Sequence, residues 1–219
     1  MQDDVISSVP PPRPGSANDR QGEHMRAFRA YWNSMRKGHD MPRRSDIDPR
    51  RIEPLLSNAF IAERIAPGVT RLRIAGMHLS DIMGMEVRGM PLSSFIAPAD
   101  RDKFALELVD VFDRPAALRL DLRSKAGVGR PELTGTLIML PLRSDLGDVS
   151  RALGCLISHG QIGRASRRFD IVNSHVEPLV AGIEANGMRA LPGGLDKAPG
   201  AMSEKPTHRS ARDYLRVIK

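Results

Sequence analysis

Apolar residues recur at three- and four-residue intervals between about Arg20 and Lys37, which predicts one amphipathic helix near the start of the chain. Asn18 or Asp19 would cap its first turn. Gly38 would end it, because glycine tolerates the left-handed backbone that follows many helices. The apolar stripe consists of Met25, Phe28, Tyr31 or Trp32, and Met35.

Short apolar runs between residues 58 and 160 predict strands. The clearest period of two lies at residues 116–124, where three leucines alternate with charged side chains. Turn-forming Gly and Pro residues separate neighbouring runs, as they do in hairpins. Five strands are predicted, over residues 58–66, 69–76, 116–124, 132–144 and 151–160.

Sequence patterns predict further helices between the leading helix and the first strand, and between the second and third strands. Asp48 before Pro49 resembles an N-cap, which predicts a short helix over residues 49–57. The run HLSDIMG predicts another, and residues 99–114 predict a longer one with an apolar face. This order predicts an α+β fold: a five-stranded antiparallel sheet with helices on one face, preceded by an N-terminal helix.

Composition divides the chain into three parts. Residues 1–19 are polar and proline-rich, so a disordered tail is expected there. The predicted domain with its leading helix covers residues 20–178, and residues 179–219 are expected to form a flexible basic tail. Residues 186–219 hold seven Lys or Arg against three Asp or Glu, which accounts for four of the net charge of +7.

The last nine residues, ARDYLRVIK, would place Tyr214, Leu215 and Ile218 on one face of a short amphipathic helix. A helix this short is marginal in water, so it should form only when it docks on its own domain or in a partner's groove. These three side chains are therefore candidates for partner docking. The alternatives are that the segment is disordered or that it binds weakly to an anionic membrane surface.

Composition also bounds the class of protein. No segment approaches the roughly 18 apolar residues that would span a bilayer, and the N-terminus does not resemble a secretory signal. The single cysteine, Cys155, cannot form an internal disulfide, which favours a reducing cytoplasm. Aromatic residues make up only 4% of the chain and do not interleave with the basic runs, which disfavours nucleic-acid binding. A soluble cytoplasmic protein is expected.

Several motifs together resemble a known family. Residues 73–79 read Arg-Ile-Ala-Gly-x-x-Leu, and residues 84–89 read Gly-x-Glu-Val-x-Gly. Further matches are Tyr31-Trp32, Pro42 with Ser45-Asp46-Ile47-Asp48-Pro49, and Leu140-Pro141-Leu142. As a set they resemble a PAS-type domain, and specifically the single-domain PAS family of alphaproteobacteria formerly catalogued as a domain of unknown function. The resemblance covers roughly residues 25–172.

The resemblance implies bacterial signal transduction by a sensory or docking module that carries out no reaction. Its expected partners are signalling proteins such as histidine kinases, and a homodimer is a further alternative. Met77 stands where the family commonly has a small hydroxyl residue, and Met83 where it commonly has Phe. Methionine fills irregular space, so the shape of any interior pocket stays open.

PAS ligands sit between the helices and the sheet, and the candidates for lining such a cavity follow from that position. They are Met77, His78, Met83, Phe95, Leu120, Met139 and Ile157. If they pack tightly, the domain is instead a scaffold for protein contacts. His78 is also a candidate haem ligand that could approach His159, but a lone histidine is more often a surface or hydrogen-bonded side chain. The sequence therefore identifies no cofactor and no metal site.

Two further features admit a functional and a structural interpretation. Arg164, Arg167 and Arg168 could clamp a phosphate, because guanidinium groups bind it bidentately, although a basic turn after the last strand is favoured.

Tyr31 and Trp32 could form a partner or dimer contact. The favoured interpretation packs Trp32 onto the sheet, while Asp46 and Asp48 accept hydrogen bonds from nearby backbone.

The leading hypothesis is a non-enzymatic regulator that acts through protein–protein contacts in bacterial two-component, cell-cycle, motility or stress signalling. Ser, His and Asp residues stand in no nucleophile-elbow context, so no catalytic residue is predicted. One alternative is a sensor that binds a small molecule in the cavity or a nucleotide at the arginine cluster. Another is a DNA-associated regulator that uses the basic tail.

Overall fold

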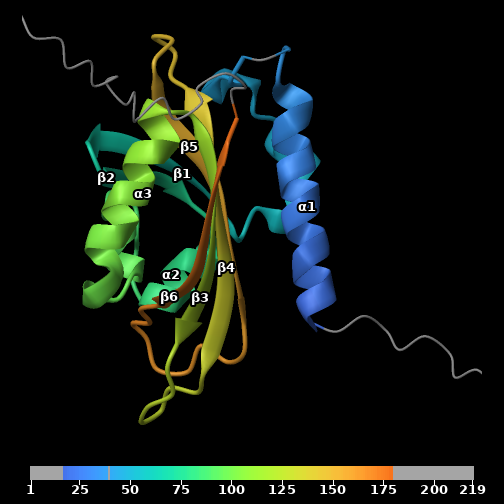
Figure 1. The fold of residues 1–219 in the computed structure, drawn as a ribbon. Helices are drawn as coiled ribbons and strands as arrows, with labels where there is room; N and C mark the ends of the chain where they lie inside the picture. The colour runs from blue at the N-terminus through green and yellow to red at the C-terminus, as the bar shows by residue number, and fades with distance from the viewer. Residues whose placement is uncertain (1–16, 39, 180–219) are drawn as a thin grey trace, which may run out of the picture. The chain divides into compact units, whose positions relative to one another are not determined.

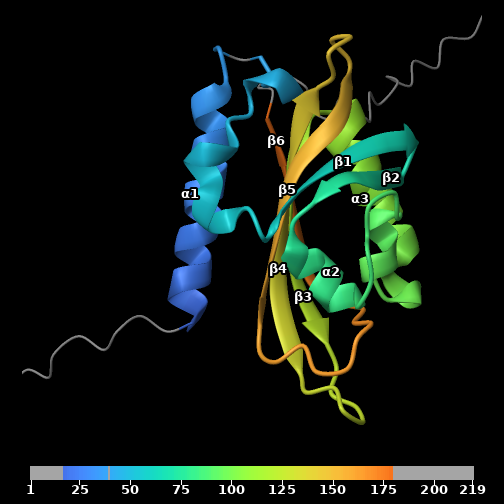
Figure 2. The same ribbon diagram turned by 180° about the vertical axis from the view of Figure 1, so that it is seen from behind.

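The computed structural model describes residues 17–38 and 40–179. Their strands form one antiparallel sheet with helices on both faces (Figures 1 and 2). The strand order is β2-β1-β5-β4-β3-β6. The strands are β1 (Ala59–Ala66), β2 (Val69–Ala75), β3 (Ala116–Ser124), β4 (Leu133–Arg143), β5 (Val149–His159) and β6 (Asp170–Pro178).

One face, the inner face, is covered by the elements that connect β2 to β3. These are α2 (Met77–Met83), the 3-10 turns η3 (Leu92–Phe95) and η4 (Pro98–Asp100), and α3 (Arg101–Asp113). Gly84 ends α2 with a φ of 70°, a left-handed conformation that glycine adopts without strain. Because strand side chains alternate between faces, the leucines of β3 point inward and complete a core with the apolar side of α3.

The leading helix α1 (Ala17–Met35) covers the opposite, outer face together with η1 (Arg44–Asp46) and η2 (Pro49–Leu55). The predicted apolar stripe of α1 is buried in a second core against β4 and β5. The indole Nε1 of Trp32 donates a hydrogen bond to the carbonyl of Pro141, at 3.0 Å. α1 is therefore an integral layer of the domain.

Hydrogen bonds to two aspartates shape the connection from α1 to β1, as predicted. Asp46 accepts from the backbone N–H of Arg43 at 2.8 Å. Asp48 caps η2 by accepting from the N–H of Arg50 at 3.1 Å. The short helix predicted after Asp48 is present, but as a 3-10 helix.

The predicted α+β class, the leading helix and the antiparallel sheet are confirmed, with two differences. The sheet has six strands rather than five, because β6 follows β5 and pairs with β3. α1 begins at Ala17, so Asn18 and Asp19 lie within the helix and neither is its N-cap.

Candidate functional site: a polar groove on the outer face

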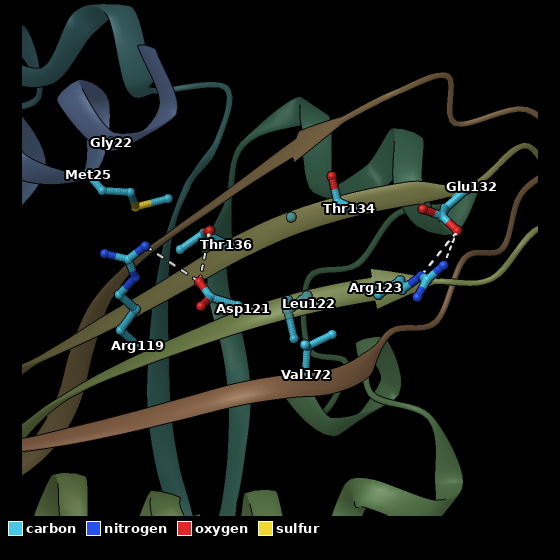
Figure 3. A pocket seen from close by; sticks show the side chains of 11 residues that line it. Gly22, Met25, Arg119, Asp121, Leu122, Arg123, Glu132, Thr134, Thr136 and Val172 are labelled. Atoms are coloured by element: carbon cyan, nitrogen blue, oxygen red, sulfur yellow. Dashed lines mark hydrogen bonds and ion pairs between the residues drawn. The ribbon is translucent and has the colours of Figure 1, made fainter. Parts of the chain in front are cut away.

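A polar groove lies on the outer face of the sheet, between the N-terminal half of α1 and strands β3 and β4 (Figure 3). Its volume is about 590 Å³. Gly22 and Met25 of α1 form one wall. The apolar stripe of α1 does not bury this part of the sheet, which carries charged and hydroxyl side chains. The sheet side includes Arg119, Asp121, Arg123, Glu132, Thr136 and Val172.

The charged side chains of the groove pair with one another. Arg119 lies 3.5 Å from Asp121, which also accepts a hydrogen bond of 3.4 Å from Thr136. Arg123 donates two hydrogen bonds to Glu132, of 3.1 and 2.5 Å, and this interaction raises the pKa of Arg123. Ion pairs this exposed add little to stability because solvent screens them, so a partner's polar groups can replace them at little cost.

A smaller hollow of about 270 Å³ continues the groove along α1. Both share Gly22, Met25 and Arg119. In the hollow, Arg29 of α1 donates two hydrogen bonds to Glu177 of β6, at 2.6 and 2.5 Å. These hydrogen bonds, with the charges of Arg29 and His175, hold the pKa of Glu177 below its ordinary value although partial burial opposes the shift.

The groove presents charged and hydroxyl side chains that are available for contact. Among the described residues, no group of three His, Cys, Asp or Glu side chains could hold a metal ion. The free thiol of Cys155 is buried, and burial raises its pKa to about 12, so it stays protonated and is a poor nucleophile. Half-exposed polar and charged side chains are typical of the rim of a recognition surface.

Comparison with known families adds the decisive observation. The sequence model of the PAS domain family matches residues 20–157, well over half of the chain. The chain belongs to the PAS family. PAS domains are generally sensory and do not catalyse reactions, so a broad signalling or sensory role follows. No curated protein matches the chain. Strand β6, which carries one side of the hollow, lies outside the matched residues.

The PAS interior, between α2, α3 and the sheet, contains four of the seven proposed cavity residues. Met83, Phe95, Leu120 and Met139 are buried there and belong to the inner core. The prediction is wrong for two others. Met77 is 72% exposed, and Ile157 belongs to the outer core beneath α1, because it follows the inward-facing Leu156 on an alternating strand.

The seventh candidate, His78, is partly buried at the start of α2 and makes a defined side-chain contact. Its Nε2 lies 2.9 Å from the hydroxyl of Ser158 on β5. Partial burial lowers the pKa of His78, and the nearby charge of Asp81 opposes that shift. The sequence allowed an approach to His159, but the side chain that His78 contacts is that of the preceding residue, Ser158. His78 is thus engaged as a hydrogen-bonding side chain.

The three arginines proposed as an anion clamp do not converge. Arg167 is 1% exposed, and its guanidinium donates to the carbonyls of Ser124, Pro131 and Ile162 and to the Ser124 hydroxyl, at 2.6–3.3 Å. Burial lowers the pKa of Arg167, and the charge of Arg130 adds to this effect. Arg164 and Arg168 are exposed. Arg167 therefore joins the end of β3 to two loops, and all three nitrogens of its guanidinium already donate hydrogen bonds within the protein.

The docking candidates in α1 are also part of the packed structure. Tyr31 and Trp32 are buried, and the Tyr31 hydroxyl donates to the carbonyl of Asp48 and accepts from its N–H, at 3.0 and 2.8 Å. Neither side chain presents a surface to a partner, so the favoured structural interpretation holds. Tyr214, Leu215 and Ile218, with both predicted tails, lie largely outside the described residues.

Sequence reasoning missed the groove itself. The alternation of β3 identified the leucines as a buried face and its charged residues as a wet face, and that signal was correct. It could not show that α1 crosses this wet face and turns it into a groove. None of the described helices is long and apolar enough to cross a membrane.

Proposed function

We propose that this chain is a non-enzymatic PAS signalling protein that contacts other signalling proteins through the outer groove. The observation that carries the proposal is the contrast between the two faces. The inner core, where PAS ligands would bind, is filled by packed apolar side chains. The outer face offers an open groove of about 590 Å³ with hydrogen-bonding groups of both signs.

The partner is proposed to be a signalling protein such as a histidine kinase, on the resemblance of the motifs to single-domain bacterial PAS proteins. A cytoplasmic location is proposed with it, on the single reduced cysteine. Packing of Phe95, Leu120 and Met139 favours this scaffold role over the small-molecule sensor, which needs interior space. The DNA alternative depends on the basic tail, outside the described residues.

A matched pair of variants tests the groove. Val172 lines it and is 56% exposed, whereas Leu106 is 72% exposed on α3, over the inner face. Val172→Arg adds a bulky charge within the groove, and Leu106→Arg adds the same group elsewhere. In quantitative pull-downs with the full chain, Val172→Arg should lose the partners that wild type and Leu106→Arg retain. Equal recovery by all three proteins would contradict the proposal.

A further inference from the structure

The hollow beside the groove has an excess of positive charge. Arg26 and Arg29 reach it from α1 and Arg119 from β3, and the imidazole of His175 on β6 also lines it. Glu177 is the one acid among the described residues that line it. That carboxylate is already bonded to Arg29 through both of its oxygens. The charge of Arg29 is therefore balanced locally, whereas those of Arg26 and Arg119 are not balanced within the hollow.

Both of these arginines can accept a new anion. Arg119 is 53% exposed at its side chain, and its contact with Asp121 is long at 3.5 Å. Figure 3 shows its guanidinium turned toward Met25 of α1. Arg26 is exposed, and no described carboxylate forms an ion pair with it. Its guanidinium lies over Gly22, where an added Cβ would come within 3.2 Å of Nη1.

The floor of the hollow strengthens such a contact. It is formed by Ala117 and Ile138, both buried and both part of the outer core. A carboxylate placed above them loses part of its hydration, which increases its attraction to a nearby guanidinium. Arg–carboxylate pairs also have a directional, bidentate geometry, which adds selectivity for this group.

The rest of the groove restricts what kind of anion fits. Along the outer face of β3 the charges alternate as positive, negative and positive at Arg119, Asp121 and Arg123. Same-face residues of a strand are about 6.6 Å apart, the spacing of alternate residues in any extended peptide. A nucleic acid would place phosphates opposite Asp121 and Glu132 as well, where they are repelled.

We infer that the groove binds an extended acidic segment of a partner protein, with one carboxylate between Arg26 and Arg119. This inference rests on the proposed function and specifies that the partner's binding segment is acidic. A second carboxylate, four residues along the segment, faces Arg123. The residue midway between them is neutral or basic, because it faces Asp121.

Three synthetic peptides test this pattern on the full chain by NMR amide-shift titration. One is Glu-Ser-Ser-Ser-Glu, the second has the same composition with adjacent acids, and the third carries Gln in place of Glu. The first should bind about tenfold more tightly than the third and measurably more tightly than the second, because only it matches both arginines. Its amide shifts should map to β3, β6 and the first half of α1, and its affinity should fall with added salt.

Matched double variants distinguish specific binding in the hollow from non-specific attraction to positive charge. Arg26→Gln with Arg119→Gln should weaken binding of the first peptide by about tenfold. Arg88→Gln with Arg73→Gln removes the same charge elsewhere: Arg88 is an exposed arginine without an ion pair, and Arg73 is paired with Glu63. This control pair should leave the affinity nearly unchanged.

Several results would overturn the inference. Equal loss in both double variants means non-specific attraction, and equal affinity for the first two peptides removes the spacing argument. Tighter binding of a poly(dT) strand at the same residues assigns the groove to nucleic acid. Self-association that the Arg26/Arg119 variant abolishes assigns it to a second copy. If the peptides fail while Val172→Arg still loses partners, the proposed function stands and only the acidic chemistry is wrong.

Discussion

Arg29 of α1 and Glu177 of β6 are joined by two hydrogen bonds, although they lie 148 positions apart in the sequence. Immediately after the end of α1, Arg36 donates to the carbonyl of Leu179, the residue that follows β6, at 3.2 Å. The leading helix and the last described strand are therefore tied together twice, once in the hollow and once where each of them ends. A partner that displaces α1 would also loosen β6.

The first prediction concerns this tie. Glu177→Gln should lower the free energy of unfolding at pH 7 by about 1 kcal/mol, because the pair is bidentate but the Glu177 side chain is 42% exposed. Folding lowers the pKa of Glu177, so its stabilisation is present above the unfolded pKa and is lost as the pH falls through the folded value. Urea unfolding should thus show a smaller difference between wild type and variant near pH 3.5.

Asp121→Asn is the control for this first prediction. Its arginine partner lies 3.5 Å away, so the variant should cost less than Glu177→Gln at pH 7. If wild type and Glu177→Gln differ in free energy of unfolding by the same amount at both pH values, the carboxylate charge is not the source of the stabilisation.

The first five strands could be predicted from sequence, but β6 could not, and the reason is physical. Alternation reveals a strand when one face is buried and the other is wet. The residues of β6 are half-buried or exposed on both faces, because the strand borders the groove and lies at the sheet's edge. A register shift opposite Asp121 and Leu122 interrupts the alternation further.

The second prediction concerns the buried guanidinium of Arg167. Arg167→Met should destabilise the fold by about 3 kcal/mol, because three backbone carbonyls and a hydroxyl lose their donor inside the protein. Arg168→Met, at the exposed neighbouring position, should change stability by less than about 0.5 kcal/mol. Chemical denaturation measures both. Similar values for the two variants would mean that the carbonyls find other partners.

The third prediction concerns Gly154 of β5, which lies opposite Phe60 in the sheet. A Cβ at position 154 would come within 2.1 Å of the Phe60 ring, and that ring is buried. Gly154→Ala should therefore cost about 1–3 kcal/mol through overpacking. Phe60→Leu should recover part of this loss in the double variant, although it is destabilising alone. Purely additive losses in thermal or urea unfolding would contradict the steric explanation.

The candidate site was less predictable than the fold, as individual residues show. A period of two indicates that Leu156 and Ile157 face opposite sides, but it does not indicate which side is which until the helices are placed. The sequence around Arg167 resembles an anion clamp, yet loops at residues 124–131 and 162–167 fold over this side chain and occupy its donors. Both outcomes depend on tertiary contacts that no local pattern contains.

The fourth prediction concerns the contact between His78 and Ser158. Partial burial lowers the pKa of His78 in the native state. At a pH between this lowered pKa and the ordinary histidine pKa, the unfolded chain therefore binds more protons than the native state. Stability should then rise with pH through about pH 5 to 7, around the ordinary histidine pKa of about 6.5. His78→Gln cannot take up the proton and should reduce this slope. NMR titration of the His78 ring in the native protein measures the pKa directly, and a value above 6.5 would show that the charge of Asp81 outweighs burial.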